Sequence, residues 1–147
     1  MFYKEQEKRD IEQVIEIFQD VITTSKDING NPSMDIVWSE AMGVYYFAFY
    51  DCTDVLFNQY RAKAITSAHQ LFWIMSRVIM DQARNEWYKD FMKQMDRSMF
   101  ITKLHVNDLL KERIKPYVDR LPQYSFMADE ALKESRFVEV KWGYNNL

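Results

Sequence analysis

Apolar residues near the N-terminus recur every three or four positions. They are Ile11, Val14, Ile15, Phe18, Val21 and Ile22, and nearly every residue between them is polar. This spacing places the apolar side chains on one face of an amphipathic helix. We expect the helix to run from about Glu5 to Lys26 and to end at residues 29–32, where glycine and asparagine tolerate positive φ and proline cannot continue a helix. The apolar face could dock on a partner protein, but the rest of the chain is available to cover it, and we expect an intrachain contact.

The segment from Ile36 to Tyr50 is apolar around almost its whole circumference when it is drawn as a helix. Only an element surrounded by others can satisfy such a surface, so we expect a central second helix with Ser33 as its N-cap. The residues from Gly43 to Tyr50 are also typical of a buried strand rich in aromatic side chains. No second strand of comparable quality is evident nearby in the sequence, so the helix is the favoured interpretation.

A third apolar stripe keeps steps of three or four residues over a long stretch. It comprises Ile65, Ala68, Phe72, Met75, Ile79, Ala83, Trp87, Phe91, Met95 and Met99. The stripe predicts a long helix from Asp54 to Met95, with Asp51 or Thr53 as its N-cap. At a rise of about 1.5 Å per residue the helix would be about 60 Å long. We therefore expect it either to project beyond the other helices or to bend near residues 81–85.

Two shorter helices complete the expected fold. Asn107 or Asp108 can cap a helix that continues to about Tyr117, and a last helix should cover residues 126–137. Residues 138–142 alternate apolar and polar with the period of a strand. One short strand without a partner is not a sheet, so we expect a short extended C-terminal tail.

Helix-breaking residues are scarce in the middle of the chain. Between Pro32 and Pro116 there is no proline and a single glycine, Gly43. Each of these residues is unfavourable inside a helix, so their absence leaves the stretch free to be helical. The sequence thus predicts an all-α fold: an antiparallel bundle of four to five helices with one long helix, in a single domain that covers residues 1–147.

The charge balance argues against several classes of partner. The chain has 19 Lys and Arg against 22 Asp and Glu, a net charge of −3 and a pI near 5.4. Such a chain has no general attraction for nucleic acid or anionic lipid, and only the stretch from Lys103 to Arg120 is mildly basic. The densest apolar window, from Val44 to Phe57, is shorter than the roughly 20 residues that a membrane span requires. We expect neither nucleic acid nor a membrane as a partner.

The N-terminus and the single cysteine indicate a cellular location. The first ten residues carry acidic side chains and lack the apolar core of a secretory signal. Cys52 has no partner for an intrachain disulfide and lies among apolar residues, as a small buried thiol does in a reducing compartment. We therefore expect a protein that begins at Met1 and is cytoplasmic.

Candidate metal, cofactor and nucleophile sites are weak. His69 and His105 are the only histidines, and Thr66 and Thr102 stand three residues before them, where di-iron helical bundles need glutamate. The three isolated glycines cannot form a phosphate-binding loop. Nothing local predicts that Cys52 and a histidine form a catalytic dyad. The sequence predicts no metal site, no cofactor and no catalytic residue.

The acidic residues Glu40, Asp51 and Asp54 border the most apolar stretch, so they should be capping, paired or functional. On a continuous helix Glu40 and Asp51 would share one face at a separation of about 16 Å, too far to share a proton or a metal ion. Helix capping explains Asp51 and Asp54 without any chemistry.

Large adaptable side chains are abundant, with nine Met, ten Phe, nine Tyr and four Trp. Several lie at chain ends and turns, where they either close the ends of the bundle or form an interface, since Tyr, Trp and Met are enriched where proteins meet proteins. We therefore expect a non-enzymatic protein that acts by binding another protein or by self-association, most commonly as a homodimer, in the role of a regulator, an inhibitor or an assembly subunit. The residues expected at the interface are Trp87, Tyr88, Phe91, Trp142 and Tyr144.

Two other functions stay open. The first is a helical enzyme or small-ligand binder with an aromatic-lined pocket between helices. Its polar groups would be Glu40, Asp51, Asp54, His69 and His105. The second is nucleic-acid binding through the stretch from Lys103 to Arg120.

Overall fold

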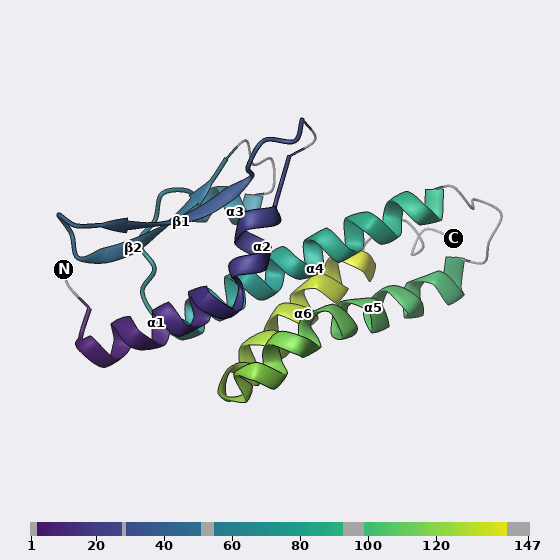
Figure 1. Ribbon diagram of the computed structural model, residues 1–147. Helices are drawn as coiled ribbons and strands as arrows, with labels where there is room; N and C mark the ends of the chain where they lie inside the picture. Colours follow the sequence, from purple (N-terminus) through teal and green to yellow (C-terminus); the bar gives the residue numbers. More distant parts are fainter. Residues whose placement is uncertain (1–2, 28, 51–54, 93–98, 141–147) are drawn as a thin grey trace. The chain divides into compact units, whose positions relative to one another are not determined.

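The computed structural model describes residues 3–27, 29–50, 55–92 and 99–140, and for residues 90–92, 99–105 and 136–140 it describes the backbone alone. These residues form six α-helices, one short 3₁₀-helix and a two-stranded antiparallel sheet (Figure 1). The all-α prediction is therefore wrong, because the chain mixes helices with a β-hairpin, and the bundle of four to five helices is not confirmed. The chain divides into two compact units, unit 1 (Met1–Leu71) and unit 2 (Phe72–Leu147). A single domain over residues 1–147 remains a prediction.

The expected N-terminal helix is present but interrupted. Helix α1 covers Glu5–Ile17 and helix α2 covers Gln19–Thr24, with Phe18 between them at φ −99° and ψ 10°. The predicted apolar face is buried except for Ile15, which is half-buried, and Ile11, Val14 and Phe18 are completely shielded from solvent. The turn that follows is held by the Asp27 carboxylate, whose Oδ1 accepts the backbone N–H groups of Asn29 and Asn31 at 2.8 and 2.9 Å.

A β-hairpin replaces the helix that we expected from Ile36 to Tyr50. Strand β1 (Met34–Ser39) pairs antiparallel with strand β2 (Val44–Phe49), with Met34 opposite Phe49 and Ser39 opposite Val44. The partner of the aromatic strand is the segment just before the turn, which the helical prediction included in the helix itself. Gly43 adopts φ 66°, and its N–H donates to the Ser39 carbonyl at 2.8 Å. Glycine adopts positive φ without steric cost, so it suits this position at the end of the four-residue turn.

The segment after the hairpin interrupts the expected long helix. Helix α3 covers Val55–Tyr60, and Ala62 then takes a left-handed conformation at φ 60°, which ends the helix. Helix α4 (Ala68–Met92) begins after Ser67, whose Oγ accepts the N–H of Gln70 at 3.1 Å. The Gln70 Oε1 in turn accepts the N–H of Thr66 at 2.7 Å, an arrangement close to a capping box. The caps predicted at Asp51 and Thr53 lie outside the described residues.

Unit 2 contains α4 from Phe72 onward, helix α5 (Met99–Arg120), the 3₁₀-helix η1 (Pro122–Tyr124) and helix α6 (Ser125–Val140). The central part of the predicted stripe is confirmed, because Phe72, Met75, Ile79 and Ala83 are all buried. Helix α4 runs through residues 81–85 without a break. Helix α5 begins before the expected caps, and α6 includes residues 138–140, so the extended C-terminal tail was wrongly predicted there.

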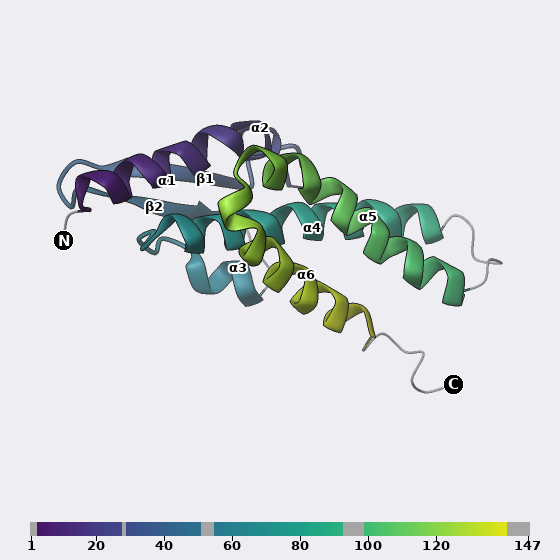
Figure 2. The same cartoon turned by 90° about the horizontal axis from the view of Figure 1, so that it is seen from below.

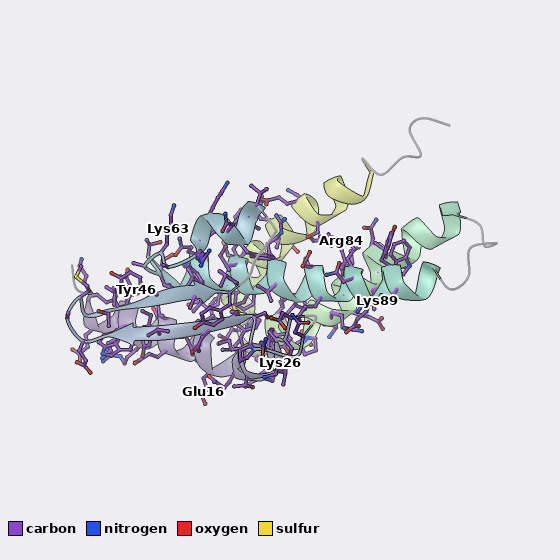
Figure 3. The ribbon with its side chains drawn as sticks, turned by 90° about the horizontal axis from the view of Figure 1, so that it is seen from above. Glu16, Lys26, Tyr46, Lys63, Arg84 and Lys89 are labelled. Carbon is purple, nitrogen blue, oxygen red and sulfur yellow. The ribbon has the colours of Figure 1, made fainter. Side chains whose placement is uncertain are left out.

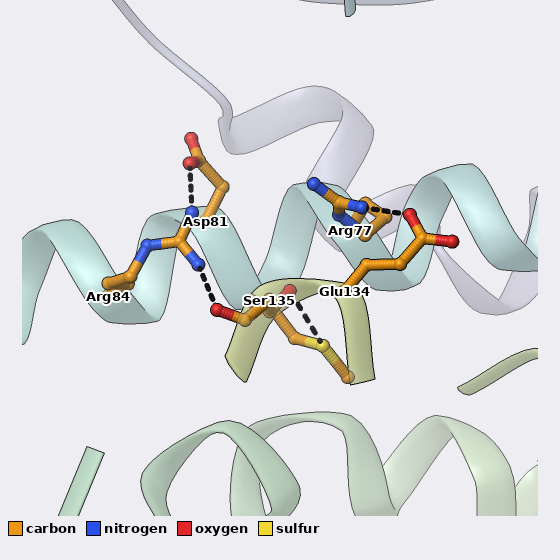
Figure 4. Close-up of polar contacts among 6 residues, drawn as sticks. Arg77, Asp81, Arg84, Glu134 and Ser135 are labelled. Carbon is orange, nitrogen blue, oxygen red and sulfur yellow. Dashed lines mark hydrogen bonds and ion pairs between the residues drawn. The ribbon is translucent and has the colours of Figure 1, made fainter. Parts of the chain in front are cut away.

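Polar contacts join α4 to the other helices of unit 2. Arg77 forms an ion pair with Glu134 of α6, and the Arg84 guanidinium reaches both Asp81 at 3.0 Å and the Ser135 carbonyl at 3.4 Å (Figure 4). Arg77 and Arg84 are seven residues apart, which is about two turns of α4, so they lie on the same face of the helix. Both contact α6 from this face. These contacts fix α6 against α4 over a core of apolar residues.

Candidate functional site

The hairpin of unit 1 has one buried face and one exposed face. Met34, Phe47 and Phe49 point to the buried face and are at most 5% exposed. Alternate side chains point the other way, and we call this second side the outer face. It comprises Asp35, Val37, Ser39, Val44, Tyr46 and Ala48 of the strands together with Tyr50, the residue after β2. Val44 at the turn end of this face is buried, and Ser39, Tyr46 and Ala48 are half-buried. Val37 and Tyr50 are each 44% exposed, and Tyr46 lies on the hairpin in Figure 3.

The opposite face is anchored on α1, which lies along the hairpin in both ribbon views (Figure 1, Figure 2). The Tyr45 hydroxyl donates to Glu12 Oε2 of α1 at 2.5 Å. Lys8 of α1 places its ammonium 4.6 Å from the centre of the Trp38 ring, and this ring lies 4.7 Å from that of Tyr45. The hairpin is thereby held with its outer face directed away from the helix.

A second tyrosine holds the N-terminal end of the same unit. The Tyr3 hydroxyl donates to the Ile65 carbonyl at 2.5 Å and accepts the Tyr45 N–H at 3.0 Å. Burial raises the pKa of Tyr3, and burial together with the Glu12 carboxylate raises the pKa of Tyr45 to about 12. Both hydroxyls therefore stay protonated near neutral pH, where they serve as structural hydrogen-bond donors and not as bases.

The two edges of the sheet differ. The outer edge of β2 is covered by the chain between α3 and α4. Phe47 donates its N–H to the Lys63 carbonyl and accepts the Ala62 N–H, both at 2.9 Å, and the Ile65 N–H donates to the Tyr45 carbonyl at 2.8 Å. Residues 62–65 therefore act as a short third chain segment beside β2. No strand among the described residues pairs with the other edge of β1, which we call the free edge.

A groove lies where the free strand meets α2. Its volume is about 530 Å³, within the range of pockets that hold ligands or peptide side chains. The residues that shape it include Ile22, Thr23 and Lys26 from α2 and the turn after it, and Met34, Asp35 and Tyr50 from the hairpin. It combines apolar walls with one ammonium and one carboxylate.

The charges of the chain are unevenly divided between the two units. Unit 1 has six Lys and Arg against eleven Asp and Glu, a formal net charge of −5. Unit 2 has thirteen against eleven, a formal net charge of +2. The modest overall charge therefore conceals an acidic unit, whose field attracts basic partners and repels acidic ones.

The polar groups proposed for an interhelical pocket are spread over several elements. Glu40 is exposed in the hairpin turn, and His69 is exposed in the first turn of α4. Asp51 and Asp54 lie outside the described residues, and His105 lies in the part of α5 where only the backbone is described. None of these five residues lines the groove.

The residues proposed for an interface lie partly beyond what is described. Trp87 is half-buried on α4, and Tyr88 beside it is 37% exposed. Phe91 belongs to α4, but only its backbone is described, and Trp142 and Tyr144 are outside the described residues. In the basic stretch on α5, Arg113 pairs with Glu86 at 2.5 Å and Lys115 with Asp119 at 2.6 Å.

The sequence reading missed the outer face and the free edge of β1. Both depend on the alternation of side chains between the two faces of a strand over residues 34–39. A helix over the same residues has no such alternation, so the helical prediction could not show these surfaces. A signal was present, because Met34 and Ile36 alternate with the polar Asp35, but Val37 interrupts the alternation. Exposed Val37 is thus both the reason that the strand was overlooked and a main part of its surface.

Among the described residues, no group of three His, Cys, Asp or Glu side chains is placed to hold a metal ion. No helix in the described part of the chain combines the length and apolarity that crossing a membrane demands. A scan against protein-family models and searches of curated proteins and of solved structures found no match. The function is therefore inferred from the surface of the molecule.

Proposed function

We propose that the protein acts by binding another protein through the outer face of its hairpin. The observation that carries this proposal is the exposure of apolar side chains on one side of a two-stranded sheet. Val37 and Tyr50 are each 44% exposed on that face, and Met42 in the adjoining turn is 45% exposed. Burying a fully exposed large apolar side chain contributes about 1.5–3 kcal/mol. Because these three side chains are 44–45% exposed, a partner that covers them gains less than half of that at each, about 2–4 kcal/mol in total before the cost of association.

The chemical character of the face supports the same proposal. Tyrosine and methionine are enriched in protein interfaces, because they offer apolar area together with a polar or adaptable end. A two-stranded hairpin is also only marginally stable without additional packing. One face of this hairpin is covered by α1, and a partner on the other face would complete a layered arrangement.

An enzyme or a ligand binder with a pocket between helices is less well supported. Glu40 and His69 lie on separate exposed parts of unit 1. The tyrosine and glutamate groups that do converge, Tyr3, Tyr45 and Glu12, are used to hold the hairpin on α1 and the chain at Ile65. The groove lies beside the hairpin and not between helices.

A pair of matched variants tests the proposal. Val37→Asp places a carboxylate on the outer face, and Val55→Asp makes the same change on α3, where Val55 is 74% exposed. Affinity capture from a lysate of the source cells is performed with the wild type and both variants. A protein that is retained by the wild type and by Val55→Asp, and lost from Val37→Asp, supports binding through the outer face.

Capture that is identical for Val37→Asp and Val55→Asp would show that the outer face is not the binding surface. Far-ultraviolet circular dichroism of both variants confirms that they are folded. Because both substitutions add one negative charge to unit 1, general electrostatic effects cancel in the comparison.

A further inference from the structure

We infer that the free edge of β1 accepts a basic, extended segment of a partner protein as an additional strand. The inference rests on the proposed function and specifies the kind of partner. In this mode the backbone of the added strand supplies hydrogen bonds, and alternate side chains reach the neighbouring surfaces.

The backbone groups on the free edge follow from the register. Tyr50 donates its N–H to the Ser33 carbonyl at 2.9 Å, and hydrogen bonding alternates along an antiparallel pair. The groups of Met34, Ile36 and Trp38 therefore point away from β2. Among the described residues, no hydrogen bond reaches the Ile36 carbonyl or the backbone groups of Trp38. A free edge of this kind is a template for another strand.

Asp35 occupies one donor of this edge. Its Oδ1 accepts the Ile36 N–H at 2.8 Å, so this donor is satisfied within the strand while no partner is bound. Asp35 is exposed and also lines the groove. An incoming carbonyl would take the Ile36 N–H, and the released carboxylate would then be available to pair with a lysine or arginine of the incoming strand.

The groove gives the added strand a place to lie. Lys26, Ile22 and Thr23 form its other wall, opposite Met34 and Asp35 of β1. A strand rises about 3.3 Å per residue, and its side chains alternate between two sides. Apolar side chains on one side can therefore contact Ile22 and Met34, while side chains on the other side extend toward the carboxylate of Asp35.

Charge decides which partner is favoured. Unit 1 carries a formal net charge of −5. A second copy of the chain that added its own β1 would bring an equal negative charge and a second Asp35 to the same edge, which like-charge repulsion opposes. A basic segment meets the opposite field, which raises its rate of association and selects it over acidic competitors. Because Lys26 lies in the α2 wall of the groove, the cationic side chains of the segment belong on the Asp35 side and its apolar side chains on the α2 side. The occupant is therefore a basic strand from another protein.

The probe is a short synthetic peptide of alternating lysine and valine, with both ends capped and a fluorescent label. Fluorescence anisotropy measures its binding to the full chain. We expect saturable binding, and we expect Asp35→Lys to weaken it by about tenfold or more, equivalent to about 1.4 kcal/mol. Glu40→Lys, which changes the charge of unit 1 equally at the exposed turn, should weaken it by less than about threefold. Asp35→Asn keeps an oxygen acceptor for the Ile36 N–H and should fall between the wild type and Asp35→Lys.

Two further peptides test the backbone pairing. One carries methyl groups on the backbone nitrogens of its lysines, and the other carries them on the backbone nitrogens of its valines. Each peptide therefore lacks the backbone N–H donors on one edge, while its charge is unchanged. Pairing along β1 uses only one edge of the peptide. We therefore expect one methylated peptide to lose binding and the other to retain it.

Several results would overturn the inference. These are no binding of the lysine–valine peptide, equal binding of a glutamate–valine peptide, retention of both methylated peptides, or equal weakening by Asp35→Lys and Glu40→Lys. A dimer in sedimentation experiments that Asp35→Lys alters would identify a second copy as the occupant and would also overturn it. If the peptides fail while capture of a protein still depends on Val37, the strand addition is refuted and the proposed function stands.

Discussion

Replacing Phe72 by alanine should remove a large part of the stability of unit 2. Phe72 is completely shielded from solvent, and its ring stacks on Tyr124 with centroids 5.3 Å apart and an interplanar angle of 27°. Truncation of a buried phenylalanine to alanine costs about 3–5 kcal/mol, because apolar burial is lost and a cavity remains. The aromatic pair accounts for about 0.5–1.5 kcal/mol of contact energy beyond the buried area.

Urea unfolding monitored by far-ultraviolet circular dichroism measures this loss. With a urea dependence of about 2 kcal/mol per molar, a loss of about 4 kcal/mol lowers the unfolding midpoint by about 2 M. Phe126 on α6 is the matched control, since it is 62% exposed and its truncation should change stability by no more than about 0.5 kcal/mol. Equal midpoints for Phe72→Ala and Phe126→Ala would refute the buried register of α4.

Three further predictions concern single positions. The pKa of Tyr45 is about 12 in the folded protein against an ordinary 10.0, so the stability that its neutral hydroxyl contributes should be lost as the pH rises through this interval. Unfolding at graded alkaline pH should show a smaller loss for Tyr45→Phe, and equal losses would contradict the role of the Glu12 bond. Gly30 has φ 82°, and no other described residue beyond its chain neighbours comes within 4 Å of an added Cβ. Gly30→Ala should therefore cost about 1 kcal/mol through backbone strain, measured as a lower melting temperature. If the protein forms a homodimer through α4, Tyr88→Ser should weaken it in sedimentation experiments, whereas an unchanged association constant would exclude Tyr88 from the interface.

Helical periodicity predicted the parts of the fold in which one face is buried. The stripe from Ile11 to Ile22 and the stripe from Phe72 to Ala83 both follow the 3.6-residue period, and both are buried apart from the half-buried Ile15. Such patterns are readable because each residue's exposure depends on its own helix and one neighbouring surface.

The hairpin and the break before α4 were not predicted, for a different reason. A segment rich in aromatic residues satisfies the apolar criterion in either conformation, and the choice depends on a partner strand and on residues 62–65, which lie beyond the window of the pattern. Ala62 gives no sequence signal that it will adopt positive φ. The pairing of Ser67 with Gln70 was a usable helix-start signal that the continuous stripe obscured.

The candidate surface could be predicted only in its general nature. An excess of tyrosine and methionine favours the hypothesis of protein binding, which stays a prediction. The location of the proposed surface required the strand parity that places Val37 and Tyr46 on one face and Phe47 on the other. The net charge of the whole chain, −3, likewise does not show that unit 1 carries −5, because the boundary between the two units is known only from the structure.

The bonds of Tyr3 have a consequence for the order of events during synthesis. Its hydroxyl joins Tyr45, 42 positions later, and Ile65, 62 positions later. Helix α1 leaves the ribosome before the rest of unit 1, yet the contact that holds the start of this helix needs a carbonyl that is made much later. Closing so long a loop costs conformational entropy, which only the completed contacts offset. A chain arrested before Ile65 therefore contains the residues of α1 and of the hairpin but lacks the Tyr3–Ile65 hydrogen bond that joins the start of the chain to the segment beside β2.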